Sequence, residues 1–323
     1  KAWSEIRSDM VRDKVLMTDQ KYRVSHPYLS IRVATPPVTN PHVAIGGLGG
    51  SGTRVFAATL SEAGIRLGAQ LNVPLDNLWF TVLFKRADWI QHGPPAAEVE
   101  IAAKLLRRAM TTGLCGTLSV EEHALLMCLR DLLPPNGSWQ NGARAADAES
   151  LINSGPPKVG SDQPWGWKEP NTHVFLPHLA QVFPECRYIH VVRDGLDMAF
   201  SKNTWQARHW SHLFGLPQDP NTSLALHQLR YWIAANSAAI DFGRAHMPGR
   251  FLVMSYEAYC ADPERHWPRL RRFLDLPDHT SLPANLLQPT TIGRSKEHDI
   301  SQFPSDVVTR ARDLQAEIDA HHF

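Results

Sequence analysis

A run of glycines between a short apolar segment and a helix-like segment constrains the fold of this chain most strongly. Residues 46–52 contain five glycines, and the apolar residues 43–45 before them favour a buried strand. The apolar spacing of residues 55–63 predicts a helix that begins at Thr53 and ends at Gly64. Glycines let backbone N–H groups approach an anion, and a helix N-terminus adds partial positive charge. The segment is therefore expected to bind a phosphate-like group.

A kinase-type phosphate loop, the Walker A motif, is disfavoured by the residues at the end of the glycine run. That motif requires lysine followed by serine or threonine, because the lysine must reach the transferred phosphate. Here Gly52 is followed by Thr53 and Arg54. The hydroxyl is present but the lysine is not, so the sequence points away from this class.

A dinucleotide-binding loop is the second class, since Gly47, Gly49 and Gly52 reproduce the G-x-G-x-x-G spacing. This class also needs an acidic residue about 20 residues further on, at the end of the next strand, to bind a ribose. The next strand is expected at residues 65–67, and the acidic candidate, Asp76, lies well beyond it. A Rossmann-type oxidoreductase that binds NAD(P) is therefore an alternative with a poor fit.

Charge and composition exclude several other classes of function. The formal net charge of +1 gives no electrostatic footprint for nucleic acid. No apolar run reaches the ~18 residues that a membrane-spanning helix needs, and residues 1–5 do not start a signal peptide. The four cysteines are far apart and form no CxxC pair, so we expect free thiols, no metal site and a soluble cytoplasmic protein.

A second strand–helix unit carries polar residues where parallel sheets bind ligands. Residues 188–192 are rich in β-branched side chains and predict a parallel strand. Arg193 follows at its carboxyl end, the edge at which open α/β sheets bind ligands. A helix is expected from Gly195 onward, and it carries Ser201.

The remaining pattern completes an α/β fold. A strand is expected at 251–255, within a central parallel sheet of about five strands flanked by helices. Further helices are expected at 98–133 (two helices, divided at 111–113), 172–183, 222–246, 262–274 and 305–320. Residues 134–164, rich in Pro, Gly, Ser, Asn and Ala, are interpreted as a surface excursion or lid. We interpret residues 1–323 as a single domain with a helical and loop insertion around 70–164.

Together these segments resemble the sulfotransferases that use 3′-phosphoadenosine-5′-phosphosulfate (PAPS), especially bacterial members of the branch that includes tyrosylprotein and carbohydrate enzymes. The resemblance rests on Gly-Ser-Gly-Thr-Arg at 50–54 and on Arg193 with Ser201 eight residues later. Lys-Glu-Pro at 168–170 is similar to the Lys-Asp-Pro of this branch, and residues 256–276 resemble the closing strand–helix unit of the family. The resemblance implies a three-layer, P-loop-like α/β domain. It also implies in-line transfer of a sulfuryl group from PAPS to a hydroxyl acceptor, with PAP as the product.

The resemblance assigns particular residues to the cofactor. Arg193 and Ser201 match the 3′-phosphate site of the family, and Arg294 and Lys296 lie in a loop that often contacts the same phosphate. The residues of the glycine loop expected to bind the 5′-phosphosulfate are Gly49, Gly50, Ser51, Gly52, Thr53 and Arg54.

One position departs from the family pattern. The family usually has Lys or Arg two residues before the Gly-Thr pair, and Gly50 stands there in this chain. Sulfuryl transfer needs positive charge at the bridging oxygen of the leaving phosphate. Lys168 is the first candidate to supply it, followed by Arg54 and then by Lys85 or Lys296. The other explanation is a catalytically silent protein that binds PAP.

The acceptor side is less constrained by the sequence. Asp76 is the candidate for the base that takes the acceptor proton, with a turn or helix cap as its structural alternative. Trp205, His209 and Trp210 follow the predicted Ser201 helix and either line an acceptor site or pack in the core. The sequence is compatible with a glycan, a phenol, a lipid alcohol or a peptide hydroxyl as acceptor.

Overall fold

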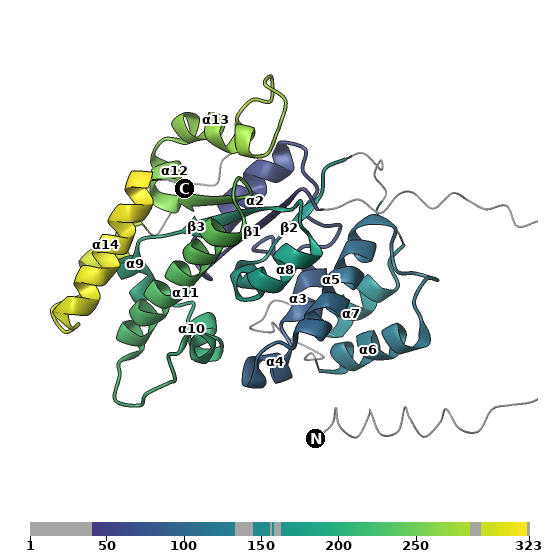
Figure 1. Ribbon diagram of the computed structural model, residues 1–323, viewed down its shortest axis with the longest axis horizontal. Coiled ribbons are helices and arrows are strands. Elements are labelled where there is room, and N and C mark those ends of the chain that lie inside the picture. The colour runs from purple at the N-terminus through teal and green to yellow at the C-terminus, as the bar shows by residue number, and fades with distance from the viewer. Residues whose placement is uncertain (1–40, 133–144, 156, 158–162, 285–291, 322–323) are drawn as a thin grey trace, which may run out of the picture. The chain divides into compact units, whose positions relative to one another are not determined.

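A parallel sheet of four strands lies at the centre of the fold (Figure 1). The computed structural model describes residues 41–132, 145–155, 157, 163–284 and 292–321. The strands are β1 (Val43–Gly47), β2 (Gly166–Lys168), β3 (Arg187–Val192) and β4 (Phe251–Ser255), in the order β2-β1-β3-β4. In the register, Ile45 lies opposite both Lys168 and Ile189. Because all strands run in one direction, the residues that follow them meet at one edge of the sheet.

The strand expected at 65–67 does not form within the described part of the chain. Its only contribution to the sheet is a single parallel bridge between Arg66 and Trp165. Gly64 and Gly68 flank this segment with φ of 93° and 145°, so extended backbone is confined to the few residues between them. The expected sheet of about five strands is therefore four strands and one bridge.

Alternate residues of the strands enter two separate apolar cores, which makes the fold three-layered. Val43 and Ile45 of β1 pack in one core with Phe56 of α2 (Thr53–Glu62). Ala44, between them, packs in the other core. Successive side chains of a strand point to opposite faces, so both faces of this sheet are covered. This confirms the predicted α/β class.

The first core is formed with helices that follow the first and the last strand of the chain, β1 and β4. It contains Leu60 of α2, Tyr259 of α12 (Tyr256–Ala261) and Leu270 of α13 (Pro263–Phe273). The aromatic rings of Phe56 and Tyr259 are 4.6 Å apart between centroids. α13 begins as expected, with the Asp262 side chain accepting a hydrogen bond from the Arg265 N–H.

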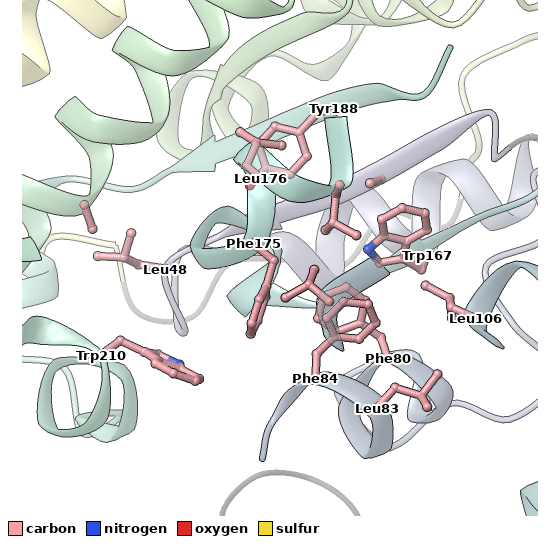
Figure 2. Packing of buried hydrophobic residues seen from close by; sticks show 14 of the residues in the cluster. Leu48, Phe80, Leu83, Phe84, Leu106, Trp167, Phe175, Leu176, Tyr188 and Trp210 are labelled. Carbon is pink, nitrogen blue, oxygen red and sulfur yellow. The ribbon is translucent and has the colours of Figure 1, made fainter. Parts of the chain in front are cut away.

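The second core is larger and includes the helices inserted between β1 and β2. These are α3 (Leu78–Phe84), α4 (Ala87–His92), α5 (Ala96–Thr111), α6 (Val120–Asp131) and α7 (Ala145–Ile152). Figure 2 shows Phe80 and Phe84 of α3 beside Trp167 of β2 and Phe175, and the two phenylalanine rings stack at 4.2 Å. The apolar contacts continue from the insertion to the sheet. This continuity supports our proposal that the insertion belongs to the same domain.

The other helices cover the same face of the sheet or its edge. They are η2 (Pro170–Phe175, a 3-10 helix), α8 (Leu176–Val182), α9 (Gly195–Ala199), α10 (Trp205–His209), η3 (Ser211–Phe214), α11 (Leu224–His246), η4 (Arg294–Glu297) and α14 (Ser305–His321). The helices expected at 98–133, 222–246 and 305–320 are present, and a 3-10 turn begins the one expected at 172–183. Most of the predicted excursion at 134–164 lies outside the described residues. Among the helices that the structure describes, none has the length and apolar character needed to span a bilayer.

Candidate active site

The glycine loop joins β1 to α2 with a backbone that only glycines adopt readily. Gly47, Gly50 and Gly52 have φ of 143°, 101° and 89°. A Cβ at Gly52 would lie 2.0 Å from the ring of Tyr256, so the loop also packs too closely for a side chain there. Gly52 is the N-cap of α2 and provides no side-chain cap. The first N–H groups of the helix are therefore left for a ligand.

Ser51 supplies the clearest sign that this loop fits an anionic group. Its side chain is 1% exposed, and its Oγ has no hydrogen-bond partner among the described residues. A buried hydroxyl without a partner is costly, so such a group usually has a ligand or water to bind. The hydroxyl and the helix N-terminus together suit a phosphate or phosphosulfate oxygen.

The backbone at position 50, where the chain departs from the family pattern, is not one that a basic residue adopts readily. With φ of 101°, Gly50 lies in a region that side-chain-bearing residues rarely adopt. A Cβ there would also come within 3.3 Å of the Ser201 Oγ. The loop therefore excludes the usual basic residue by its own geometry and brings Gly50 close to Ser201.

Arg193 follows β3 and reaches the same loop. Its Nη1 donates to the Gly50 carbonyl at 3.4 Å, and its Nη2 pairs with Asp197 Oδ2 at 3.3 Å. Its carbonyl accepts a hydrogen bond from Trp232 Nε1 at 2.9 Å, which fixes the backbone at the end of the strand. The side chain is 4% exposed. The guanidinium is therefore buried and fixed at the edge of the sheet, and its planar set of donors is of the kind that suits a phosphate.

A second carboxylate stands behind Arg193. Glu257 Oε1 lies 3.8 Å from Arg193 Nε and accepts a hydrogen bond from the Asp194 N–H at 3.1 Å. Burial raises the pKa of Glu257 to about 7, although that hydrogen bond and the nearby guanidinium act in the opposite direction. The charge beside Arg193 therefore changes near neutral pH.

Asp197 joins the loop of residues 292–297 to this site. Its Oδ2 accepts from the Gly293 N–H at 2.7 Å, and its Oδ1 accepts from the Ser295 N–H at 2.8 Å. Arg294 is half-buried, and its Nη1 has no hydrogen-bond partner within the described ranges. Lys296 is exposed. The loop of Arg294 and Lys296 therefore lies next to α9, which follows Arg193.

Ser201 lies just beyond α9 and not within a helix, which corrects the expectation from sequence. Its Oγ accepts a hydrogen bond from the Asn203 N–H at 3.2 Å. The helix ends because Gln228 Nε2, from α11, donates to the carbonyls of Ala199 and Ser201 at 2.8 and 3.2 Å. A side chain thus satisfies carbonyl groups that would otherwise continue the helix.

Lys168 and Asp76 meet at the carboxyl end of β2. Lys168 Nζ lies 2.5 Å from Asp76 Oδ1 and donates to the Pro74 carbonyl at 2.9 Å. The Lys168 carbonyl accepts from the Asn77 N–H at 2.8 Å, and Asn77 caps α3, so the strand and the loop hold each other. Asp76 immediately precedes Asn77, so Asp76 is not the N-cap of α3.

The charge of Asp76 is stabilised inside the protein. Burial alone raises the pKa of this carboxyl, but the ammonium groups of Lys168 and Lys85 and hydrogen bonds from Lys168 and Asn72 outweigh burial. The pKa of Asp76 therefore lies below its usual value. The carboxylate is ionised and lies against a buried lysine.

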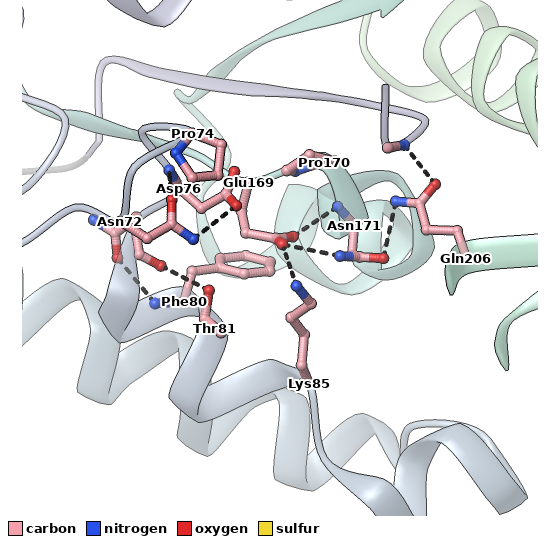
Figure 3. Close-up of polar contacts among 12 residues, drawn as sticks. Asn72, Pro74, Asp76, Phe80, Thr81, Lys85, Glu169, Pro170, Asn171 and Gln206 are labelled. Carbon is pink, nitrogen blue, oxygen red and sulfur yellow. Dashed lines mark hydrogen bonds and ion pairs between the residues drawn. The ribbon is translucent and has the colours of Figure 1, made fainter. Parts of the chain in front are cut away.

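A further set of polar residues in the same region was not found from the sequence (Figure 3). Lys85 Nζ pairs with Glu169 Oε1 at 3.0 Å, and Glu169 also accepts from the N–H of Asn171 at 2.6 Å. Asn171 Oδ1 accepts from Gln206 Nε2, and Gln206 Oε1 accepts from the Gly49 N–H, each at 2.9 Å. From the sequence, Lys85 was named only as a possible source of positive charge and Glu169 only as the middle residue of Lys-Glu-Pro, and Asn171 and Gln206 were not named.

The aromatic candidates separate into core and partly accessible residues. Trp210 is 0% exposed and donates from Nε1 to Asn171 Oδ1 at 2.8 Å, so it packs in the core. Trp205 is half-buried, its ring stacks on His209 at 4.5 Å, and Lys85 Nζ lies 5.1 Å from its centroid. Arg54, on the first turn of α2, is exposed.

Comparison with known proteins identifies the class. The model of the sulfotransferase family matches residues 41–280, and the chain belongs to this family. No curated protein matches the sequence significantly.

Solved structures that resemble the chain carry the same description. The sulfotransferase domain of the olefin synthase from Synechococcus PCC 7002 is 17% identical, with 87% of this chain and 97% of that chain covered and a TM-score of 0.43. The sulfotransferase domain of the curacin biosynthetic pathway is 14% identical, with coverages of 86% and 98% and a TM-score of 0.42. A sulfotransferase from Alicyclobacillus acidocaldarius is 13% identical, with coverages of 85% and 96% and a TM-score of 0.41.

Proposed function

We propose that the protein transfers a sulfuryl group from PAPS to a hydroxyl acceptor and releases PAP. One observation carries the proposal: two anion-binding elements touch each other at the carboxyl edge of the sheet. The glycine loop forms one element, and its Ser51 hydroxyl has no partner in the part of the chain that the structure describes; Arg193 forms the other element. The Arg193 Nη1 to Gly50 carbonyl contact of 3.4 Å joins them. A nucleotide with phosphates at both its 5′ and 3′ positions matches a pair of neighbouring sites of this kind.

The residues of the loop and of β3 would bind the two ends of the cofactor. Ser51 and the first N–H groups of α2 would hold the 5′-phosphosulfate, and Arg193 with Ser201 would hold the 3′-phosphate. PAPS supplies the activated sulfuryl group. Asp197 keeps the Arg294 loop beside Arg193, where it can add charge to the same phosphate.

Lys168 and Asp76 are proposed to act on the reacting groups. Lys168 stands at the end of the strand next to β1, so it can stabilise negative charge on the leaving oxygen. Asp76 is ionised and can accept a proton from an acceptor hydroxyl. Their 2.5 Å contact keeps the ammonium and the carboxylate side by side in the protein without bound ligand.

The alternatives drawn from the sequence gain no support. A dinucleotide-binding protein would have a second strand after α2 that ends in an acidic residue, and only the Arg66–Trp165 bridge forms there. A silent PAP-binding protein was suggested by Gly50. The backbone at Gly50 explains that residue, and the buried Lys168 supplies a positive charge at the same edge.

The first experiment compares ligands and then follows the sulfate. PAP should raise the melting temperature, because a ligand that binds only the native state stabilises it, and NADPH should not. Labelled PAPS incubated with a cell extract should yield a labelled product, whose mass spectrum gives the acceptor class. A shift with NADPH and none with PAP would reverse the proposal, and PAP binding without any labelled product would reduce it to nucleotide binding.

The compartment belongs to the same proposal. All four cysteines are free thiols in the structure. Free cysteines suit a reducing environment, and we place the protein in the cytoplasm on this basis.

A further inference from the structure

A line of hydrogen bonds runs from the inserted helices to the glycine loop, and we call it the amide relay. It consists of Lys85, Glu169, Asn171, Gln206 and the N–H of Gly49 (Figure 3). The contacts are 3.0 Å from Lys85 to Glu169, 2.9 Å from Asn171 Nδ2 to Glu169, 2.9 Å from Gln206 to Asn171 and 2.9 Å from Gly49 to Gln206. The relay thus connects groups from α3, η2 and α10 to the loop.

The direction of every bond in the relay is fixed by its two ends. The Glu169 carboxyl oxygens accept from Lys85 and from Asn171, and the N–H of Gly49 only donates. Each amide between them must therefore point its NH2 group toward Glu169 and its oxygen toward the loop. Trp210, which only donates, fixes the Asn171 oxygen a second time at 2.8 Å.

Burial protects the relay from competition with water. Glu169, Asn171 and Gln206 are 0%, 2% and 5% exposed. A buried polar group that loses its partner pays its full desolvation cost, so each member depends on the others. Lys85 neutralises the carboxylate at the end of the relay and is itself 7% exposed.

Gly49 connects the relay to the part of the glycine loop that is expected to bind the anion. Gly49 is followed by Gly50, which Arg193 contacts, and then by Ser51, whose hydroxyl has no partner among the residues described. The Gly49 N–H turns toward Gln206 and away from any anion in the loop. The Ser51 N–H is also used within the loop, since it donates to the Leu48 carbonyl at 2.9 Å. The side chain of Ser51 and the N–H groups at the start of α2 are therefore the donors that face an incoming anion.

We propose that Gln206 is a positioning residue for the donor site, and that Asn171 and Glu169 hold it in place. Gln206 fixes the start of the glycine loop in the shape that receives the 5′-phosphosulfate. This inference rests on the proposed function, because it concerns the affinity of the same loop for PAP. It adds a residue that does not itself touch the cofactor.

The test measures PAP affinity by calorimetry in folded variants. Gln206→Leu leaves the Gly49 N–H without its partner, and PAP binding should weaken by about tenfold. The KM for PAPS should rise by a similar factor, while kcat at saturating PAPS should change much less. Asn236→Leu is the matched control, since it removes another buried amide that bonds His190 and not the loop. It should lower the melting temperature and leave PAP affinity unchanged.

A double-mutant cycle separates positioning from general damage. Asn171 reaches Gly49 only through Gln206, so Asn171→Leu combined with Gln206→Leu should weaken PAP binding no more than Gln206→Leu alone. Additive losses, or wild-type PAP affinity in folded Gln206→Leu, would overturn the proposal. If wild-type protein does not bind PAP, the proposed function fails before the relay is addressed.

One measurement needs no variant. The Gly49 amide should exchange slowly with deuterium in the free protein, because its hydrogen bond ends in a buried network. Exchange as fast as in an unstructured peptide would show that Gln206 does not hold the loop. This readout decides the proposal if Gln206→Leu does not fold.

Discussion

Lys168 Nζ and Asp76 Oδ1 are 2.5 Å apart, although 92 residues separate them in the sequence. The sequence predicted a role in catalysis for each residue separately. The structure joins them into one buried ion pair at the end of β2.

Lys168→Ala should lose turnover far more than PAP affinity. The lysine is proposed to act on the leaving oxygen, and removal of such a donor typically costs about 10²–10³ in kcat. PAP lacks the sulfuryl group, so its binding should change little. Steady-state kinetics and calorimetry on the same preparation give both values.

Two further variants sharpen the test of Lys168. Lys168→Arg should recover little activity, because a planar guanidinium does not replace a compact ammonium. Lys104→Ala removes an exposed lysine paired with Glu100 and should behave as wild type. Near-normal kinetics for Lys168→Ala would assign the lysine to the structure alone.

The same ion pair should also be visible in stability. Lys168→Met leaves the buried Asp76 carboxylate without its main partner and should lower the free energy of unfolding by about 3 kcal/mol. Lys168→Met combined with Asp76→Asn removes both charges and should regain most of that loss. Urea denaturation at pH 7 measures both. A double variant that is less stable than Lys168→Met would contradict the pairing.

Arg193→Ala should weaken PAP binding by about tenfold or more, since a hydrogen bond to a charged group is typically worth about 1.5–3 kcal/mol. Arg187 begins the same strand at its opposite end and pairs with Asp275 at the surface. Arg187→Ala is therefore a control that should leave PAP affinity intact. Equal PAP affinity in the two variants would mean that the 3′-phosphate site lies elsewhere.

Two buried histidines should make the free energy of unfolding decrease as the pH is lowered. Burial lowers the pKa of His173 to about 4 and that of His190 to about 3. Below the unfolded value of about 6.5, the unfolded chain binds protons that the folded protein does not. Each histidine should therefore remove about 2 kcal/mol of stability between pH 7.5 and 5.

The measurement is the free energy of unfolding in urea at those two pH values. His190→Gln keeps a polar group but does not titrate, so its stability should depend less on pH. His123 is exposed on α6, and His123→Gln should keep the pH dependence of the wild type. An unchanged pH dependence in His190→Gln would show that this histidine does not resist protonation.

Local patterns allowed the sequence to predict the strand–loop–helix unit and the strand before Arg193. Each depends on neighbours along the chain: the glycines set the loop, and β-branched residues set β3. The end of α9 could not be predicted, because Gln228 terminates it from α11. The amide relay was missed for the same reason, since its members come from separate helices and follow no fixed spacing.

The pairing of Lys168 with Asp76 also could not be predicted from the sequence. The sequence named Asp76 as a candidate base but could not show that Lys168 is its partner. The two meet because the Asn77 N–H donates to the Lys168 carbonyl, which holds the loop of Asp76 against β2. Propensity gives no information on such a contact. The strand predicted at 65–67 is an error of the opposite kind, since the pattern predicted an element that does not form. Its composition suits a strand, but its flanking glycines limit its length.

The positive φ of Gly50 limits which residues can replace this glycine. With φ of 101°, a single substitution to lysine or arginine at this position would strain the loop as well as add the charge. The basic residue common in the family therefore does not fit this loop without a change in its backbone. A variant that carries the basic residue would first need a different backbone at this turn. In the chain as it stands, the proposed source of positive charge is Lys168 on β2, the strand next to β1.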